Sequence, residues 1–162
     1  MTLSKLLSAI VLLLLAAPAA AQSVDQVAPS EQAVASVSSP SGNLKVEVTV
    51  NPEGRVGYRV SRLNRPVIAD SRLGFLFTDS PQMLRNFQLA SQSTRSFDES
   101  WAQPWGEYGR IRNRYNELTV SFDEKVWMKR RMTLVFRAFD DGIGFRYQLP
   151  AAEGFTRANI AD

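Results

Sequence analysis

The feature of this sequence that most limits its fold is a strict alternation of apolar and polar residues over short segments. Residues 44–50 place four aliphatic side chains on one side and three polar side chains on the other. The same alternation returns at 56–60 and again at 143–149. A period of two residues is typical of β-strands that are buried on one face only. These segments are therefore predicted to be strands.

Turn sequences separate the predicted strands at short intervals. Asn51–Gly54, Asn64–Pro66 and Asp140–Gly142 are built from the residue types that favour turns. Asp-Gly in particular tolerates the positive φ that two-residue hairpin loops require. The whole pattern predicts roughly eight to ten short strands and no amphipathic helix. We therefore predict an all-β fold, either an antiparallel β-sandwich or a large curved sheet.

The second half of the chain extends this interpretation. Residues 111–122 and 133–139 are predicted strands, because apolar side chains recur at alternate positions or fill the segment. Trp101–Tyr108 contains Pro104 and Gly106. Since these residues interrupt regular structure, the segment is predicted to be a loop.

The N-terminal residues have the composition of an export signal. Lys5 precedes an apolar run, and the small residues at 19–21 match the specificity of signal peptidases. The run is shorter than the roughly 20 apolar residues of a membrane-spanning helix. We expect a signal peptide at 1–21, a periplasmic or secreted protein, and no membrane attachment after cleavage. Residues 22–38 are predicted to form a flexible leader before a folded domain at 39–162.

The sequence contains neither histidine nor cysteine. This composition excludes serine–histidine triads, cysteine nucleophiles, zinc sites of the usual ligand types and imidazole bases. The formal net charge is +3, and the basic residues form no clustered stripe of the kind that nucleic-acid binding needs. Nucleic acid is therefore not an expected partner. Catalytic chemistry would have to come from carboxylates, lysine, tyrosine or an oxygen-ligated metal.

Three ordered motifs resemble a known family. They are WAQPWGE at 101–107, IRNRYNEL at 111–118 and FRAFDDGIGFRY at 136–147. In this order and spacing, after a Ser-Pro-x-Gly strand start at 39–42, they resemble the N-terminal domain of glycoside hydrolase family 97. The resemblance covers about 39–162.

This resemblance implies that the chain is one part of a larger architecture. Members of the family are secreted or periplasmic bacterial α-glucosidases and α-galactosidases. They have an N-terminal β-super-sandwich similar to galactose mutarotase, a catalytic (β/α)8 barrel and a C-terminal β-sandwich. The chain would then be an incomplete N-terminal sandwich, truncated before the barrel that holds the catalytic carboxylates. Calcium is expected in the full-length enzyme, mostly on barrel glutamates, and no cofactor is expected in this chain.

The function implied by the resemblance is non-catalytic. We expect a domain that binds carbohydrate or braces the missing barrel and shapes its sugar pocket, with α-linked sugars or oligosaccharides as partners. No catalytic residue or metal ligand of the family can be matched to a position in this sequence. The alternative is a free-standing periplasmic carbohydrate-binding β-sandwich protein.

Tryptophans in a predicted loop are the main candidates for sugar contact, because the flat C–H face of a sugar stacks on an indole. The alternative is that both rings pack in the core or against another domain. The polar residues of the second motif are expected to contact the sugar or the missing barrel. The full candidate set is Trp101, Trp105, Glu107, Arg112, Asn113, Tyr115, Asn116 and Glu117.

Charged residues in the same region have simpler predicted roles. Arg112 and Arg114 share a strand face, where pairing with acids across strands is favoured over a clamp on a ligand. Glycoside hydrolysis needs a pair of carboxylates at a defined separation. The acids of this region are instead expected to be solvated at turns and strand ends: Asp98, Glu99, Glu107 and Glu117.

Overall fold

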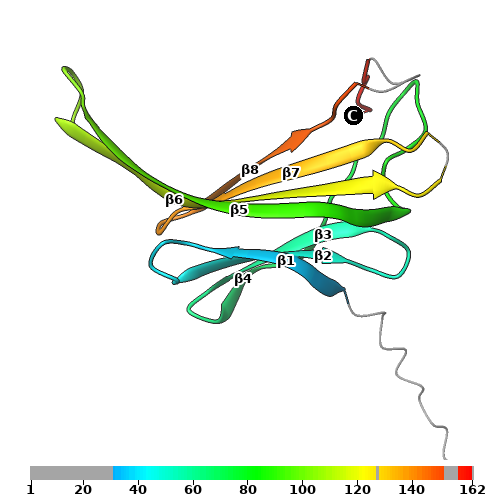
Figure 1. Cartoon of the computed structure of the whole chain (residues 1–162), viewed down its shortest axis with the longest axis horizontal. Helices are drawn as coiled ribbons and strands as arrows, with labels where there is room; N and C mark the ends of the chain where they lie inside the picture. The colour runs from blue at the N-terminus through cyan, green and yellow to red at the C-terminus, as the bar shows by residue number, and fades with distance from the viewer. Residues whose placement is uncertain (1–30, 127, 152–156, 162) are drawn as a thin grey trace, which may run out of the picture.

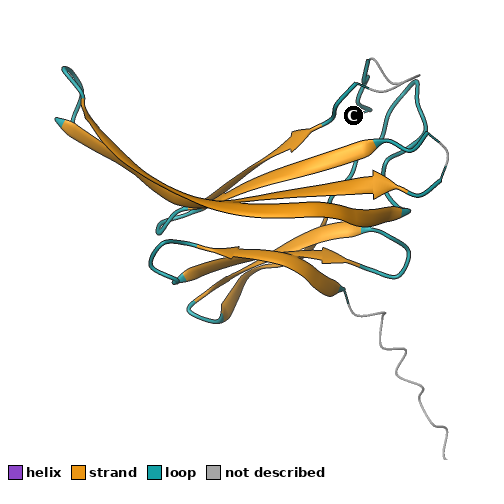
Figure 2. Ribbon diagram, in the orientation of Figure 1, coloured by secondary structure: helices purple, strands orange, loops and turns teal. Residues whose placement is uncertain are grey.

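The computed structural model of the protein describes residues 31–126, 128–151 and 157–161. The regular elements in these residues are β-strands, arranged as two four-stranded antiparallel sheets that pack face to face (Figures 1 and 2). The predicted antiparallel β-sandwich is therefore confirmed. The signal predicted at 1–21 lies outside the described residues. Within the described residues, no helix has the length and apolar character needed to cross a membrane.

The first sheet is a meander whose strands follow one another in order. At the turn between the second and third strands, Gly54 has a φ of 71° and donates its N–H to the Asn51 carbonyl at 2.9 Å. At the next turn, Leu63 and Asn64 both have positive φ, which suits the twist of a two-residue hairpin. The strands are β1 (Gln32–Ser38), β2 (Leu44–Val50), β3 (Val56–Arg62) and β4 (Arg65–Arg72).

Strand β1 corrects the prediction of a flexible leader at 22–38. Residues 32–38 pair antiparallel with β2, and Ala35 and Val37 are buried in the core. A β-bulge between Ala33 and Ala35 interrupts the period of two. Because the side chains of this strand are also small, the alternation is weak in the sequence. The remainder of the predicted leader lies outside the described residues.

The second sheet contains the longest strands. β5 and β6 pair along their full lengths, whereas β7 joins β6 only over residues 116–123. The far ends of β5 and β6 therefore project beyond the sandwich as a two-stranded ribbon, at the upper left of Figure 1. We call residues 97–115 the arm. The strands are β5 (Phe87–Ala102), β6 (Arg110–Glu124), β7 (Arg131–Ala138) and β8 (Ile143–Gln148).

The arm corrects the loop predicted at 101–108. Trp101 and Ala102 are the last residues of β5 and pair with β6. The connecting loop is confined to residues 103–109. Pro104 and Gly106 lie within this loop, but they do not mark where it begins.

The hairpin predicted at Asp140–Gly142 is confirmed, although for a different reason. Phe139 donates its N–H to the Gly142 carbonyl at 2.8 Å, but Gly142 does not adopt a positive φ. Instead, the Asp140 carboxylate accepts a hydrogen bond from the Ser41 N–H at 2.7 Å. Contacts with Ser41 hold the pKa of Asp140 below its usual range. The turn of one sheet is thus attached to the β1–β2 turn of the other.

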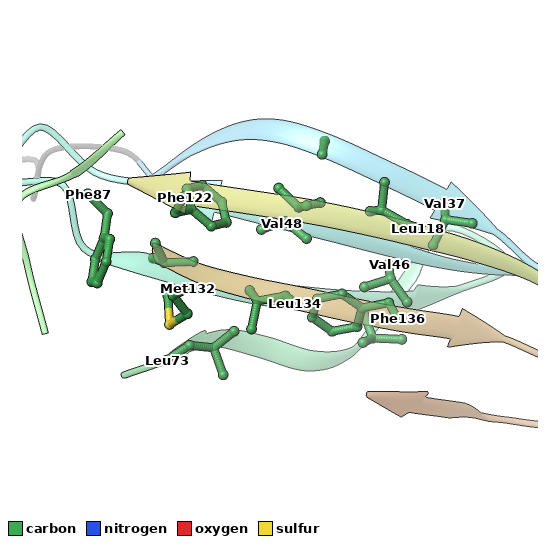
Figure 3. Close-up of a cluster of buried hydrophobic side chains, with 14 of the residues drawn as sticks. Val37, Val46, Val48, Leu73, Phe87, Leu118, Phe122, Met132, Leu134 and Phe136 are labelled. Carbon is green, nitrogen blue, oxygen red and sulfur yellow. The ribbon is translucent and has the colours of Figure 1, made fainter. Parts of the chain in front are cut away.

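The core lies between the two sheets (Figure 3). Strand β2 contributes Val46 and Val48, and β6 contributes Leu118, Val120 and Phe122, all with no exposed surface. Burying one such side chain stabilises the fold by about 1.5–3 kcal/mol. We call the face of the second sheet that carries these β6 residues the inner face, and the opposite face the outer face.

One ion pair is enclosed beside this core. Arg130 is 1% exposed and donates from Nε and Nη2 to the two carboxylate oxygens of Glu124, both at 2.9 Å. It also donates to the carbonyls of Pro81 and Gln82, at 2.6 and 3.2 Å. The guanidinium therefore attaches the loop before β5 to the β6–β7 connection.

Candidate functional site

The predicted contact residues all lie on the arm or at its base, but they do not converge on one pocket. Successive side chains along a strand point to opposite faces of a sheet. The motif of consecutive residues in β6 is therefore divided between the two faces. Trp105 and Glu107 lie in the loop, Trp101, Asn113, Tyr115 and Glu117 lie on the outer face, and Arg112 and Asn116 lie on the inner face.

The tip of the arm exposes three aromatic side chains. Trp105 is 80% exposed, Tyr108 65% and Trp101 45%. The loop that presents them is closed by a hydrogen bond from the Gln103 N–H to the Gly109 carbonyl at 3.0 Å. Leaving large aromatic surface in water is unfavourable. The two tryptophans therefore do not pack in the core of this domain, whereas their packing against another domain stays a prediction. The tip is a candidate contact surface.

Tyr115 fixes the base of the arm on its outer face and is only 3% exposed. Its ring centroid lies 5.1 Å from the rings of both Phe97 and Phe139. The guanidinium carbon of Arg137 lies 4.7 Å from the same centroid, a cation–π contact. Because these partners cover the ring, Tyr115 holds the arm in place and does not present a contact surface.

Glu117 lies beside Tyr115 on the outer face, and its carboxylate is held between two arginines. Arg95 donates from Nε to Oε1 at 2.7 Å, and Arg137 donates from Nε to Oε2 at 2.8 Å. The Glu117 side chain is 5% exposed. Burial acts to raise the pKa of Glu117, but the two guanidinium contacts outweigh it and hold the pKa below its usual range. The expectation of a solvated acid is therefore wrong at Glu117.

The inner face of the arm confirms the predicted cross-strand pairing. Arg112 donates from Nε and Nη2 to Asp98, at 2.8 and 2.6 Å, and Arg114 lies 3.8 Å from the same carboxylate. The bond from Arg112 lowers the pKa of Asp98. These groups are about half exposed, so solvent screens their attraction. Asn116 donates from Nδ2 to the Ser38 carbonyl at 2.8 Å and so satisfies a backbone acceptor of β1.

The sequence by itself does not reveal the residues that hold Glu117 and Tyr115 in place. Arg95 and Arg137 are 22 and 20 residues away from Glu117 in the chain. Only the strand register places them on either side of it, because Glu117 pairs with Arg95 across β5 and with Arg137 across β7. No local motif indicates such a contact. A signal would have appeared only after the three strands had been aligned.

The described residues do not fit the calcium expected in full-length members of the family. They contain no group of three or more acidic, histidine or cysteine side chains that could hold a metal ion.

Comparison with known proteins identifies the family. The sequence model of the family described as Glycosyl-hydrolase 97 N-terminal matches residues 37–162. This chain belongs to the glycoside hydrolase family 97 N-terminal domains. A retaining α-galactosidase from Bacteroides thetaiotaomicron is 31% identical to it over 111 residues, which make up 68% of this chain and 16% of that protein.

Solved structures of larger enzymes contain the fold of this family 97 N-terminal domain. A family 97 enzyme from Pseudoalteromonas sp. strain K8, solved in complex with panose and with acarbose, matches 78% of the chain with a TM-score of 0.73 and 33% identity. A β-arabinopyranosidase matches 75% of it with a TM-score of 0.66 and 26% identity. The family 97 N-terminal domain described here spans 19% of the length of each of these two enzymes.

Proposed function

We propose that this domain is a non-catalytic part of an α-glycosidase, where it braces the catalytic barrel and helps to shape the sugar pocket. The observation that carries the proposal is the arm. It projects beyond the sandwich and presents Trp101, Trp105 and Tyr108 at its tip. The panose and acarbose complexes of the Pseudoalteromonas relative support α-linked oligosaccharides as the class of ligand.

The base of the arm is built to hold this tip in a defined position. Tyr115 is enclosed by Phe97, Phe139 and Arg137, and Glu117 is held by two charged hydrogen bonds. Charge-assisted hydrogen bonds are stronger and shorter than neutral ones. A contact surface on a preorganised base loses less conformational entropy when it binds. The rigid base and exposed aromatic tip therefore suit a positioning role.

Two carboxylates of this region, those of Asp98 and Glu117, are unsuited to acid catalysis. A glycosidase general acid needs a raised pKa, so that it still holds its proton near neutral pH. Asp98 and Glu117 both have pKa values below the usual range, because arginines donate hydrogen bonds to their ionised forms. These two groups are therefore expected to remain ionised and to play structural parts.

Two further properties are proposed on the same basis. Export through the signal predicted at 1–21 would place the protein in the periplasm or outside the cell, and fractionation of expressing cells would test this. Calcium, where the full-length protein binds it, would use residues other than those described. Equilibrium dialysis of the isolated domain with calcium is expected to show no specific binding.

The proposed role can be tested by joining this domain in frame to a family 97 barrel. Isothermal titration with panose and acarbose would measure sugar binding, and hydrolysis and thermal melting would report on the barrel. The variant with Trp101, Trp105 and Tyr108 all changed to Ala is expected to weaken sugar binding or to lower the melting temperature of the barrel. Val67→Ala is the control, because Val67 is 63% exposed on strand β4 of the other sheet. A triple variant that matches the unmodified protein in all three measurements would refute the proposal.

A further inference from the structure

The outer edge of β5 is a long strand edge that is unpaired among the described residues. β5 is the terminal strand of its sheet and has 16 residues, none of them proline. After Phe87, every residue of the strand except Phe97 is exposed. The N–H and C=O groups along such an edge are a template for pairing with another strand.

We propose that β5 pairs antiparallel with β5 of a second copy of this chain, around a two-fold axis at Phe97. In such an arrangement, residues at equal distances on either side of the axis face each other across the two copies. Phe97 then faces Phe97 of the second copy. On the same outer face, Arg95 faces Glu99 and Ser93 faces Trp101.

Charge complementarity selects this register over its neighbours. An axis at Arg95 places two arginines opposite each other, and an axis at Asp98 or Glu99 places two acids opposite each other. An axis at Ser96 sets Arg95 against Phe97 and forms no ion pair. The axis at Phe97 produces two Arg95–Glu99 pairs and one aromatic pair, and each of these cross-strand combinations is stabilising.

The groups required for these contacts are accessible. The Arg95 side chain is 62% exposed, and its bond to Glu117 uses Nε. A guanidinium has five N–H donors, so Arg95 can also reach an acid of the second copy. Glu99 is exposed on the same face of the strand.

Pairing would also support the arm itself. The arm is a two-stranded ribbon, and isolated two-stranded ribbons are only marginally stable in water. In the antiparallel dimer, each arm lies beside the base of the other copy's β5, because Trp101 faces Ser93. The two second sheets then form one continuous sheet, in which each arm gains a third strand.

The first test measures the oligomeric state of the whole protein by sedimentation equilibrium. The unmodified protein is expected to form dimers. Glu99→Arg places like charges opposite Arg95 and is expected to raise the dimer dissociation constant about tenfold or more. Asp70→Arg makes the same charge change on β4, the far edge strand of the other sheet, where the side chain is 48% exposed, and should leave dimerisation unchanged. A protein that is monomeric at all concentrations, or a dimer insensitive to Glu99→Arg, would overturn the proposal.

The second test reads the register directly and does not depend on the charge variant. The protein has no cysteine, so a single introduced cysteine can form a disulfide only with its counterpart in another copy. Phe97→Cys lies on the proposed axis, where opposing Cα atoms are close enough for a disulfide. Oxidation is expected to cross-link this variant in high yield. Ser96→Cys and Asp98→Cys report slipped registers, and preferential cross-linking of either one would overturn the assignment.

Discussion

Replacing Arg130 by Met tests whether the enclosed ion pair holds the edge of the sandwich together. Arg130 is almost completely buried, and its guanidinium donates to Glu124 and to the carbonyls of Pro81 and Gln82. Methionine replaces the aliphatic part of the arginine side chain but has no guanidinium and no hydrogen-bond donor. The substitution therefore leaves a buried carboxylate without its cation and leaves both carbonyls without this donor.

The magnitude follows from the burial of both partners. The side chains of Arg130 and Glu124 are 2% and 5% exposed, so solvent cannot replace the missing guanidinium without opening the structure. Removing one partner of such a pair costs about 3–5 kcal/mol. The free energy of unfolding of a domain is typically about 5–15 kcal/mol. The substitution should therefore lower the melting temperature by roughly 10 °C or more.

Urea denaturation followed by far-ultraviolet circular dichroism would measure the loss. Arg131→Met is the matched control, since Arg131 also donates from Nε and Nη2 to a carboxylate, that of Asp123, but its side chain is 53% exposed. We expect little change from this control. A double variant with Arg130→Met and Glu124→Leu should recover much of the lost stability, because it removes the uncompensated charge. If the single variant unfolds like the control, or if the double variant recovers nothing, the reasoning is wrong.

Three further predictions concern acid stability, a turn and the arm tip. Asp98 and Glu117 have lowered pKa values in the folded state, so their ionised forms stabilise the fold. This stabilisation is complete above the unfolded pKa of about 4 and is lost as pH falls through the folded pKa. In melting temperatures measured at a series of pH values, Glu117→Gln should therefore lose less stability on acidification than the unmodified protein. Gly54→Ala should lower the free energy of unfolding, measured by urea titration, by about 1–3 kcal/mol. The reason is that Gly54 has a φ of 71° and that a Cβ there would lie 2.6 Å from the backbone nitrogen of Phe87. An unchanged free energy of unfolding would contradict the assigned turn. Trp105→Ala should leave the melting temperature of the isolated domain unchanged, since the indole is 80% exposed, and a clear drop would indicate packing that the structure does not contain.

The alternating segments show why much of the fold was predictable. In β2, the side chains of residues 44, 46 and 48 face the core, as their spacing predicts. The turns at Asn51–Gly54 and Asp140–Gly142 were recognisable from composition alone. The ordered motifs at 101–147 indicated the family before any contact was known. These signals are local, because the period of a strand and the residue types of a turn can be recognised from a few consecutive residues.

Features that depend on distant residues could not be predicted in the same way. β1 has small side chains and a bulge, so its burial against β2 leaves little trace in its own sequence. β5 and β6 pair as far as Ala102 and Arg110, so the start of the segment that was predicted to be a loop is part of the arm. Glu117 was expected to be solvated, and it is instead enclosed by arginines from the strands on either side.

The sequence alone therefore determined the class of fold, the inward face of the clearest strands and the family. The tertiary structure decided which strands extend past the sandwich, which carboxylate is buried and which tryptophans remain in water. The physical reason is that alternation selects a face within one strand, whereas a contact across strands depends on their register. Register brings together Arg95, Glu117 and Arg137, which are about 20 residues apart in sequence.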